Sequence, residues 1–141
     1  MVELPGNRMG ILYCGTPPHK HPRRPPYGDF GWAYWDKGRL AALEAAQDGE
    51  FALFPLIFEG RHVCLNVQTG RTGYIQVEAL DQKRNVLPGR SFEDCDLICG
   101  DFLDRTVTWR GESDLGHQDV SAVTLRFRLR NARMFSVEFK G

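Results

Sequence analysis

The chain has no excess of charge of either sign. Its 141 residues include 18 Lys or Arg and 18 Asp or Glu, so the formal net charge at pH 7 is zero. Proteins that hold nucleic acid or an acidic membrane by electrostatic attraction usually carry a clear basic excess. We therefore expect neither nucleic acid nor a membrane surface among the partners of this protein.

Long hydrophobic runs are also missing. No stretch approaches the roughly 18 uninterrupted apolar residues of a membrane-spanning helix. The N-terminus has no basic segment followed by an apolar one, as a secretory signal peptide would. The sequence thus predicts a soluble chain without a signal peptide and assigns no compartment. Because a strand-like segment, residues 9–14, follows almost at once, the chain could also be a fragment of a longer protein.

The four cysteines do not have the spacing of a known metal or haem motif. They are Cys14, Cys64, Cys95 and Cys99, and only the last two lie close together in the sequence. A chain of this length buries enough surface to fold without disulfides. We predict free or merely packed thiols, with two disulfides as the alternative. The chain also lacks a glycine-rich phosphate loop, a nucleophile elbow and a zinc-protease motif.

What the sequence does contain is typical of an all-β protein. Five prolines lie within residues 15–31, which excludes a helix or a central strand there and predicts an extended arm. Beyond it, short segments rich in β-branched and aromatic residues recur roughly every 10–12 residues between turn residues, as in β-sandwiches and barrels. The expected organisation is an N-terminal strand and Pro-rich arm over residues 1–30, followed by a β-sandwich domain over residues 31–141.

Two segments illustrate the local patterns. Apolar and cationic residues alternate over 123–130, so we expect a hairpin with its turn at Asn131-Ala132 and a second strand over 135–139. The cationic residues of the first strand form a row, Arg126, Arg128 and Arg130. This row could bind phosphate, but a surface that faces solvent or a neighbouring domain fits the zero net charge better. Residues 39–46, by contrast, have the composition of a helix.

Two groups of residues are candidate metal ligands. Cys14, His19 and His21 are of the types that bind zinc, but a fourth ligand is not nearby, and solvent-facing histidines on an arm are the alternative. Loop 94–104 holds four aspartates, Asp94, Asp96, Asp101 and Asp104. They could bind Ca²⁺, stabilise tight turns, or in principle hydrolyse a glycosidic bond. Turn stabilisation is the simplest of these hypotheses.

Aromatic residues are the candidate carbohydrate ligands. Trp32, Tyr34 and Trp35 form one short segment, and Trp109 lies in a strand-like segment downstream. Flat aromatic rings suit the C–H faces of sugar rings, whereas the alternative is packing in a core or between domains.

From Gly31 onward the chain resembles a C-terminal β-sandwich region of uncharacterised bacterial proteins. In those proteins the region follows a five-bladed β-propeller of the invertase/levanase and arabinanase type. The strand at Leu12-Tyr13 and the arm that follows look like the end of the last propeller blade and the linker leaving it. The matching stretches are 32–35 (WAYW), 38–45 (GRLAALEA), 49–51, 55–56, 65–67 (LNV), 88–96 (PGRSFEDCD), 100–101, 107–109 (VTW), 113–115 and 125–132 (LRFRLRNA).

This resemblance implies a jelly-roll-like antiparallel β-sandwich in which residues 39–46 form a strand despite their helix propensity. It implies a parent protein that acts on or binds carbohydrate. The catalytic carboxylates of that enzyme class lie in the propeller, so the resemblance assigns no catalytic residue to this chain. The sandwich of such enzymes mostly packs on the propeller and stabilises it.

Three functional hypotheses follow. The first is a non-catalytic accessory module of a glycoside-hydrolase-like protein, which packs on and stabilises a neighbouring domain. The second is a carbohydrate-binding module that uses aromatic stacking. The third and most remote is a small hydrolase that uses loop 94–104. The expected partner is a preceding propeller-type domain or a second copy of the chain, with carbohydrate as a further candidate.

Overall fold

The computed structural model describes residues 1–15, 28–117 and 121–141. These residues contain seven strands and no helix, and every strand pair is antiparallel. The predicted all-β, antiparallel fold class is therefore confirmed. Within the same residues, nothing helical has the length and apolar character needed to cross a membrane. The prolines of the expected arm and both zinc-candidate histidines, His19 and His21, lie outside the described residues.

The chain divides into two compact units, Met1–Leu40 and Ala41–Gly141. The first is a three-stranded sheet with the order β1-β2-β3, made of β1 (Val2–Leu4), β2 (Arg8–Gly15) and β3 (Asp29–Asp36). The expected boundary at residues 30/31 differs from the observed one because β3 runs across it and pairs with β2 along its whole length. The aromatic segment 32–35 thus belongs to the N-terminal unit.

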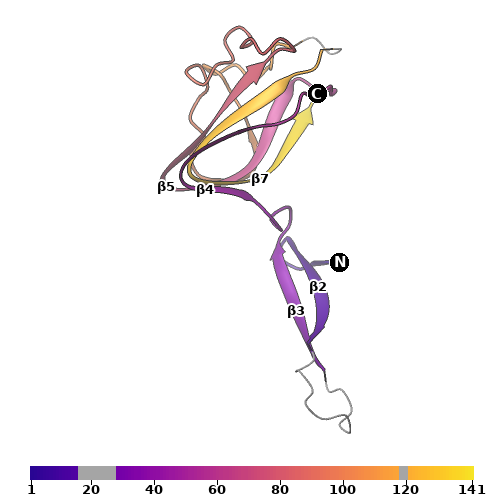
Figure 1. Cartoon of the computed structure of the whole chain (residues 1–141). Helices are drawn as coiled ribbons and strands as arrows, with labels where there is room; N and C mark the ends of the chain where they lie inside the picture. The colour runs from indigo at the N-terminus through magenta and orange to yellow at the C-terminus, as the bar shows by residue number, and fades with distance from the viewer. Residues whose placement is uncertain (16–27, 118–120) are drawn as a thin grey trace. The chain divides into compact units, whose positions relative to one another are not determined.

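The second unit contains a four-stranded sheet with the order β4-β7-β5-β6 (Figure 1). Its strands are β4 (Leu43–Ala52), β5 (His62–Leu80), β6 (Asp101–Thr106) and β7 (Thr124–Lys140). The expected jelly roll has two four-stranded sheets, and the strand order seen here does not establish that arrangement. A β-sandwich is consistent with the unit, and the jelly roll stays a prediction.

The C-terminal segment is one long strand, so the predicted hairpin is wrong. Residues 124–130 of β7 pair with residues 74–80 of β5, and residues 132–140 pair with residues 62–69. Asn131, with a φ of 42°, bends the strand between these halves and does not reverse it. Alternating residues on both sides of position 131 fit a hairpin as well as a bent strand, and only pairing with the distant β5 distinguishes them.

The bend passes through three neighbouring strands. The register of β4 shifts between Ala45 and Asp48, and that of β5 shifts between Thr69 and Tyr74, on either side of Asn131 in β7. Bulges of this kind turn a sheet so that its two halves can face a common core. Gly73 allows β5 to approach β7 closely at the bend, because a Cβ at this position would lie 2.2 Å from the Asn131 carbonyl oxygen. We call this line the sheet corner.

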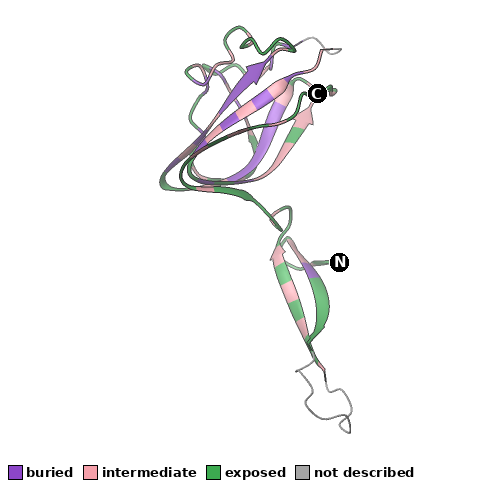
Figure 2. Cartoon of the chain, in the orientation of Figure 1, coloured by how far each residue is buried: buried purple, intermediate pink, exposed green. Residues whose placement is uncertain are grey.

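The core lies in the second unit and follows the alternation of the strands. Leu125, Phe127 and Leu129 of β7 are buried, while the arginines between them face outward, as the pattern predicted. Figure 2 shows the buried residues concentrated on β5 and β7. Further buried side chains come from β5 and the loops: Val63, Leu65, Val67, Ile75, Val77, Ile98, Val107, Trp109, Leu115 and Val123.

The helix-prone segment forms no helix. Residues 39–42 lie outside regular structure, and β4 begins at Leu43 and pairs with β7. The strand that the resemblance implied over 39–46 is thus present from residue 43. Pairing with an already buried strand outweighs the few tenths of a kcal/mol per residue that alanine-rich sequences gain in a helix.

Candidate functional site

The four aspartates of loop 94–104 do not converge on a common point. Each carboxylate is instead bonded to a different neighbour. Asp94 accepts a hydrogen bond of 2.8 Å from Ser91 Oγ. Asp96 accepts hydrogen bonds of 2.6 Å from Thr108 Oγ1 and 2.9 Å from Gly111 N. Asp101 accepts one of 2.9 Å from Gln68 Nε2, and Asp104 accepts one of 2.5 Å from Lys140 Nζ. In the described part of the chain no three potential metal-ligating side chains gather. The expected Ca²⁺ cluster therefore does not form there.

The same hydrogen bonds keep three of these carboxyls ionised. The Ser91 hydroxyl lowers the pKa of Asp94, the Thr108 hydroxyl lowers that of Asp96, and Lys140 lowers that of Asp104. A glycosidase acid needs the opposite, a carboxyl whose pKa is raised so that it holds a proton near neutral pH. Stabilisation of the loop backbone is the role that this geometry supports for Asp94 and Asp96. Asp101 and Asp104 lie on β6 and are bonded to side chains of β5 and β7, so they link neighbouring strands and do not stabilise a turn.

Trp109 cannot serve as a sugar platform in this fold. Its side chain is 1% exposed, and its indole Nε1 donates a hydrogen bond of 2.9 Å to the Val77 carbonyl. The residue lies in the core of the second unit, which corrects its assignment as a carbohydrate ligand. Its strand-like, β-branched surroundings fit a buried position as well as an exposed one, so the pattern could not separate the two.

The other predicted aromatic residues lie on β3 and divide between its two faces. Trp32 and Tyr34 share one face with Phe30, because side chains two residues apart point the same way, and all three are largely exposed. Their exposed fractions are 50%, 60% and 74%. Trp35 points to the opposite face and is half-buried. Phe30 was not among the aromatic candidates predicted from the sequence, although its spacing of two residues from Trp32 places it on the same face of a strand.

The neighbouring strand extends this exposed surface. Leu12 and Cys14 of β2 lie opposite Trp32 and Phe30 and are also exposed. The Arg8 guanidinium lies 4.9 Å from the centre of the Tyr34 ring. We call this surface the aromatic face; it consists of Leu12, Phe30, Trp32 and Tyr34. The other side of the same sheet also exposes apolar side chains, Ile11 and Tyr13.

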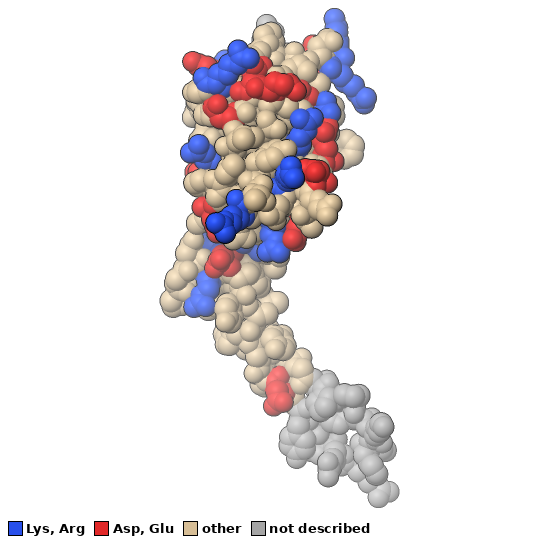
Figure 3. All heavy atoms as spheres, turned by 90° about the vertical axis from the view of Figure 1, so that its left-hand side faces the viewer, with Lys and Arg blue, Asp and Glu red and all other residues tan. Residues whose placement is uncertain are grey.

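The cationic row of β7 is paired with carboxylates. Arg126 forms ion pairs with Glu50 and with the buried Glu78, the latter at 2.8 Å, and Arg128 lies 3.6 Å from Glu50. Arg130 lies 3.8 Å from Asp48. Figure 3 shows Lys and Arg intermixed with Asp and Glu over the visible face of this unit. The row is therefore neutralised by its neighbours, which fits a structural surface better than a phosphate site.

All four cysteines are free thiols, with Cys14 and Cys99 exposed and Cys64 and Cys95 buried. Burial raises the pKa of the Cys95 thiol to about 11, and its sulfur accepts a hydrogen bond of 3.2 Å from Val77 N. A buried thiol of this kind is structural, because the reactive form is the thiolate.

Cysteine labelling gives a direct test of this arrangement. At about pH 8, iodoacetamide is expected to modify Cys14 and Cys99 of the native protein and to spare Cys64 and Cys95, since alkylation requires an accessible thiolate. Peptide mass spectrometry before and after addition of denaturant measures the four sites separately. Equal labelling rates for Cys95 and Cys99 in the native protein would contradict the structure.

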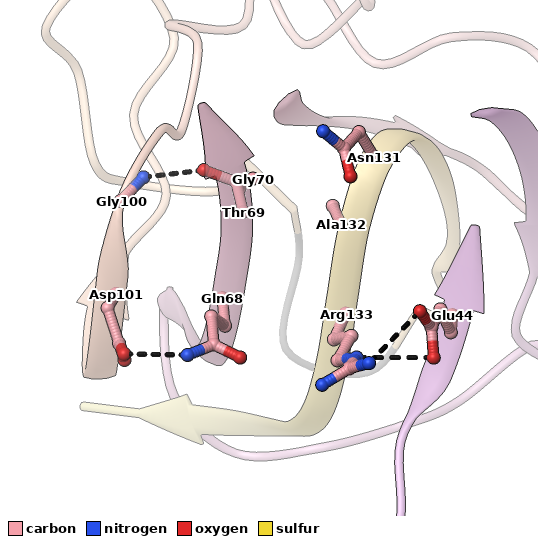
Figure 4. Close-up of a pocket in the computed structure, with 9 residues that line it drawn as sticks. All are labelled: Glu44, Gln68, Thr69, Gly70, Gly100, Asp101, Asn131, Ala132 and Arg133. Carbon is pink, nitrogen blue, oxygen red and sulfur yellow. Dashed lines mark hydrogen bonds and ion pairs between the residues drawn. The ribbon is translucent and has the colours of Figure 1, made fainter. Parts of the chain in front are cut away.

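A surface pocket of about 460 Å³ lies at the sheet corner. It was not expected from the sequence, because its residues come from all four strands of the second unit and from the loop before β6. Four of its side chains form a row across the sheet, namely Asp101, Gln68, Arg133 and Glu44 (Figure 4). No periodicity within one strand could have brought this row together.

An apolar groove of about 490 Å³ lies elsewhere on the second unit. Side chains of β4, β7 and the connection after β4 line it, among them Leu43, Leu56 and Val137. Near Leu56 in the sequence, Phe54 and Ile57 are also largely exposed.

Comparisons with known proteins give no relative. No family model matches the chain, and neither a curated protein nor a solved structure matches it.

Proposed function

We propose that this protein is a non-catalytic β module that packs on, and stabilises, a neighbouring β-rich domain. The observation that carries the proposal is the aromatic face, where Phe30, Trp32 and Tyr34 are exposed side by side on one strand. Large aromatic residues are concentrated in the cores of protein interfaces, where they bury much area at little entropic cost. Exposed contiguous apolar surface of this kind marks an interaction site.

The architecture of the first unit supports the same function. Its sheet has apolar side chains on both sides and no second layer among the described residues of that unit, and on the face seen in Figure 3 it carries few charged side chains. Small sheets gain stability when a hydrophobic face is covered. A partner that covers this sheet would supply the missing layer.

The free edge of β3 favours a partner made of β-strands. Within the described residues β3 pairs only with β2, so one edge of its eight residues is open to another strand. Edge strands recruit partners through their unpaired backbone groups. The sequence resemblance suggests a propeller of a glycoside-hydrolase-like protein as that partner.

The proposal predicts that the chain without its partner exposes an apolar surface that binds hydrophobic dyes and other copies of the chain. We expect it to enhance the fluorescence of anilinonaphthalene sulfonate and to self-associate in sedimentation velocity experiments, because the aromatic face is uncovered. Replacing Phe30, Trp32 and Tyr34 together by serine should reduce both effects.

A matched control replaces two exposed apolar residues of the second unit, Leu97 and Leu103, by serine. This variant should bind the dye and self-associate as the parent chain does. The proposal fails if the parent chain is monomeric and does not bind the dye, or if the triple variant behaves like the parent.

A further inference from the structure

The centre of the edge strand β3, residues 30–35, lacks the features that usually keep an edge strand from pairing. It contains no charged residue and no proline, and its register with β2 runs without a bulge. The edge strand β4 of the second unit differs, because it carries three carboxylates and a register shift. Edges without such protection accept another strand. We propose that two copies of this chain pair through β3, antiparallel to each other and about a twofold axis at Trp32. The inference rests on the proposed function in taking β3 as the interaction strand, and it names the partner of the edge of that strand.

The free backbone groups of this edge follow from the hydrogen bonds at its end. Lys37 N donates to the Asn7 carbonyl at 2.9 Å, one step beyond the last registered pair of β2 and β3. Hydrogen-bonded pairs in an antiparallel ladder alternate with pairs that are not hydrogen-bonded. The N–H and C=O groups of Phe30, Trp32 and Tyr34 therefore point away from β2, toward the free edge.

Asp36 fits the same assignment. It is the next residue in this series, and its carbonyl accepts a hydrogen bond of 2.9 Å from Arg39 N in the turn that follows the strand. Outside the ladder with β2, no backbone hydrogen bond of the described residues involves Phe30, Trp32 or Tyr34. These three residues thus present an unpaired row of donors and acceptors.

Pairing about Trp32 satisfies this row completely. It places Trp32 opposite Trp32 of the second copy and Phe30 opposite Tyr34, and each such pair exchanges two hydrogen bonds. Every aromatic side chain of the edge then lies opposite another aromatic one. A shift by two residues in either direction would instead place Tyr34 opposite Gly28 or Phe30 opposite Asp36. The sequence of the edge is therefore self-complementary in one register.

The same pairing joins the aromatic faces of the two copies. Directly opposite residues lie on the same side of a sheet, with about 5.5 Å between the Cα atoms of a hydrogen-bonded pair, so their rings come into contact. On the other side of the sheet Ala33 lies opposite Gly31, where neither residue is bulky enough to collide. A twofold contact uses the same edge of both copies and closes, so association ends at the dimer. The joined aromatic faces stay open to a covering domain.

The test is sedimentation velocity of the full chain and of two variants at the twofold axis, Trp32→Lys and Trp32→Glu. The parent chain should form a dimer. Each variant alone should dimerise at least about tenfold more weakly, because it places like charges directly opposite each other and removes an aromatic pair. An equimolar mixture of the two variants should dimerise more tightly than either variant alone, because opposite charges then meet across the axis.

Leu12→Lys is the matched control. Leu12 lies on the aromatic face opposite Trp32, but on β2, one strand away from the free edge. The variant adds the same charge to the face and leaves the edge intact, so it should dimerise as the parent chain does. Both positions are at least half exposed, and the amide spectrum of the ¹⁵N-labelled chain shows whether each variant keeps its fold.

Three outcomes would overturn the inference. They are a parent chain that stays monomeric, a mixture that associates no better than its separate variants, and association that Leu12→Lys abolishes as completely as Trp32→Lys does. In the last case the copies stack through their aromatic faces, so the edge pairing fails and the proposed function stands. A monomeric parent chain that binds the dye also leaves the proposed function intact, so the two proposals can fail separately.

Discussion

Replacement of Trp109 by alanine is expected to lower the free energy of unfolding of the second unit by about 3–5 kcal/mol, the usual cost of removing a large buried aromatic side chain. The indole is 1% exposed and packs in the core, and its Nε1 donates to the Val77 carbonyl at 2.9 Å. Truncation leaves both a cavity and an unpaired buried carbonyl. Urea unfolding followed by far-UV circular dichroism measures the loss.

Two further variants separate these contributions and provide a control. Trp109→Phe keeps most of the ring volume but removes the donor, so a smaller loss of about 1–3 kcal/mol is expected. Trp32→Phe, on the exposed aromatic face, should change the free energy of unfolding by no more than about 0.5 kcal/mol. A Trp109→Ala variant as stable as Trp32→Phe would show that Trp109 is not a core residue.

Replacement of Gly73 by alanine is expected to destabilise the second unit by about 2–3 kcal/mol, the cost of forcing an extra methyl group into a filled space. The new Cβ would lie 2.2 Å from the Asn131 carbonyl oxygen and 2.7 Å from that of Arg130. Both are backbone atoms of the paired strand β7, so relief requires that β5 and β7 separate at the sheet corner. The midpoint of thermal unfolding is the measurement.

Gly70→Ala is the matched comparison for this prediction. It lies on the same strand and at the same corner, but its new Cβ would meet the side-chain amide of Asn131, 2.3 Å from Nδ2, rather than backbone. A side chain can rotate away, so the cost should be clearly smaller. Equal melting temperatures for the two variants would contradict the described path of β5 past β7.

Much of the fold was predictable from residues 123–139. Alternation of apolar and cationic residues on a strand reports which side chains are buried, and Leu125, Phe127 and Leu129 are indeed in the core. The same alternation does not report what the strand pairs with. A hairpin turning at Asn131 and a single strand bent there have the same local pattern, and only contacts with β5 select the second.

The candidate sites were predictable to a smaller extent. Composition identified aromatic and acidic residues as candidates, and Trp32 and Tyr34 are exposed as a binding role requires. It could not show that Trp109 is buried. It also could not show that the carboxylates of Asp94 and Asp104 have separate partners, because those partners, Ser91 and Lys140, are set by the path of the chain.

By itself the sequence determined the all-β class, the buried face of β7 and the aromatic character of β3, because these depend on residue type and on the period-two geometry of a strand. The tertiary structure alone decided the unit boundary after Leu40, the corner at Gly70, Gly73 and Asn131, and the polar row that the corner brings together. Those features depend on which distant segments pair, and pairing is settled by the packing of the whole sheet rather than by any one strand.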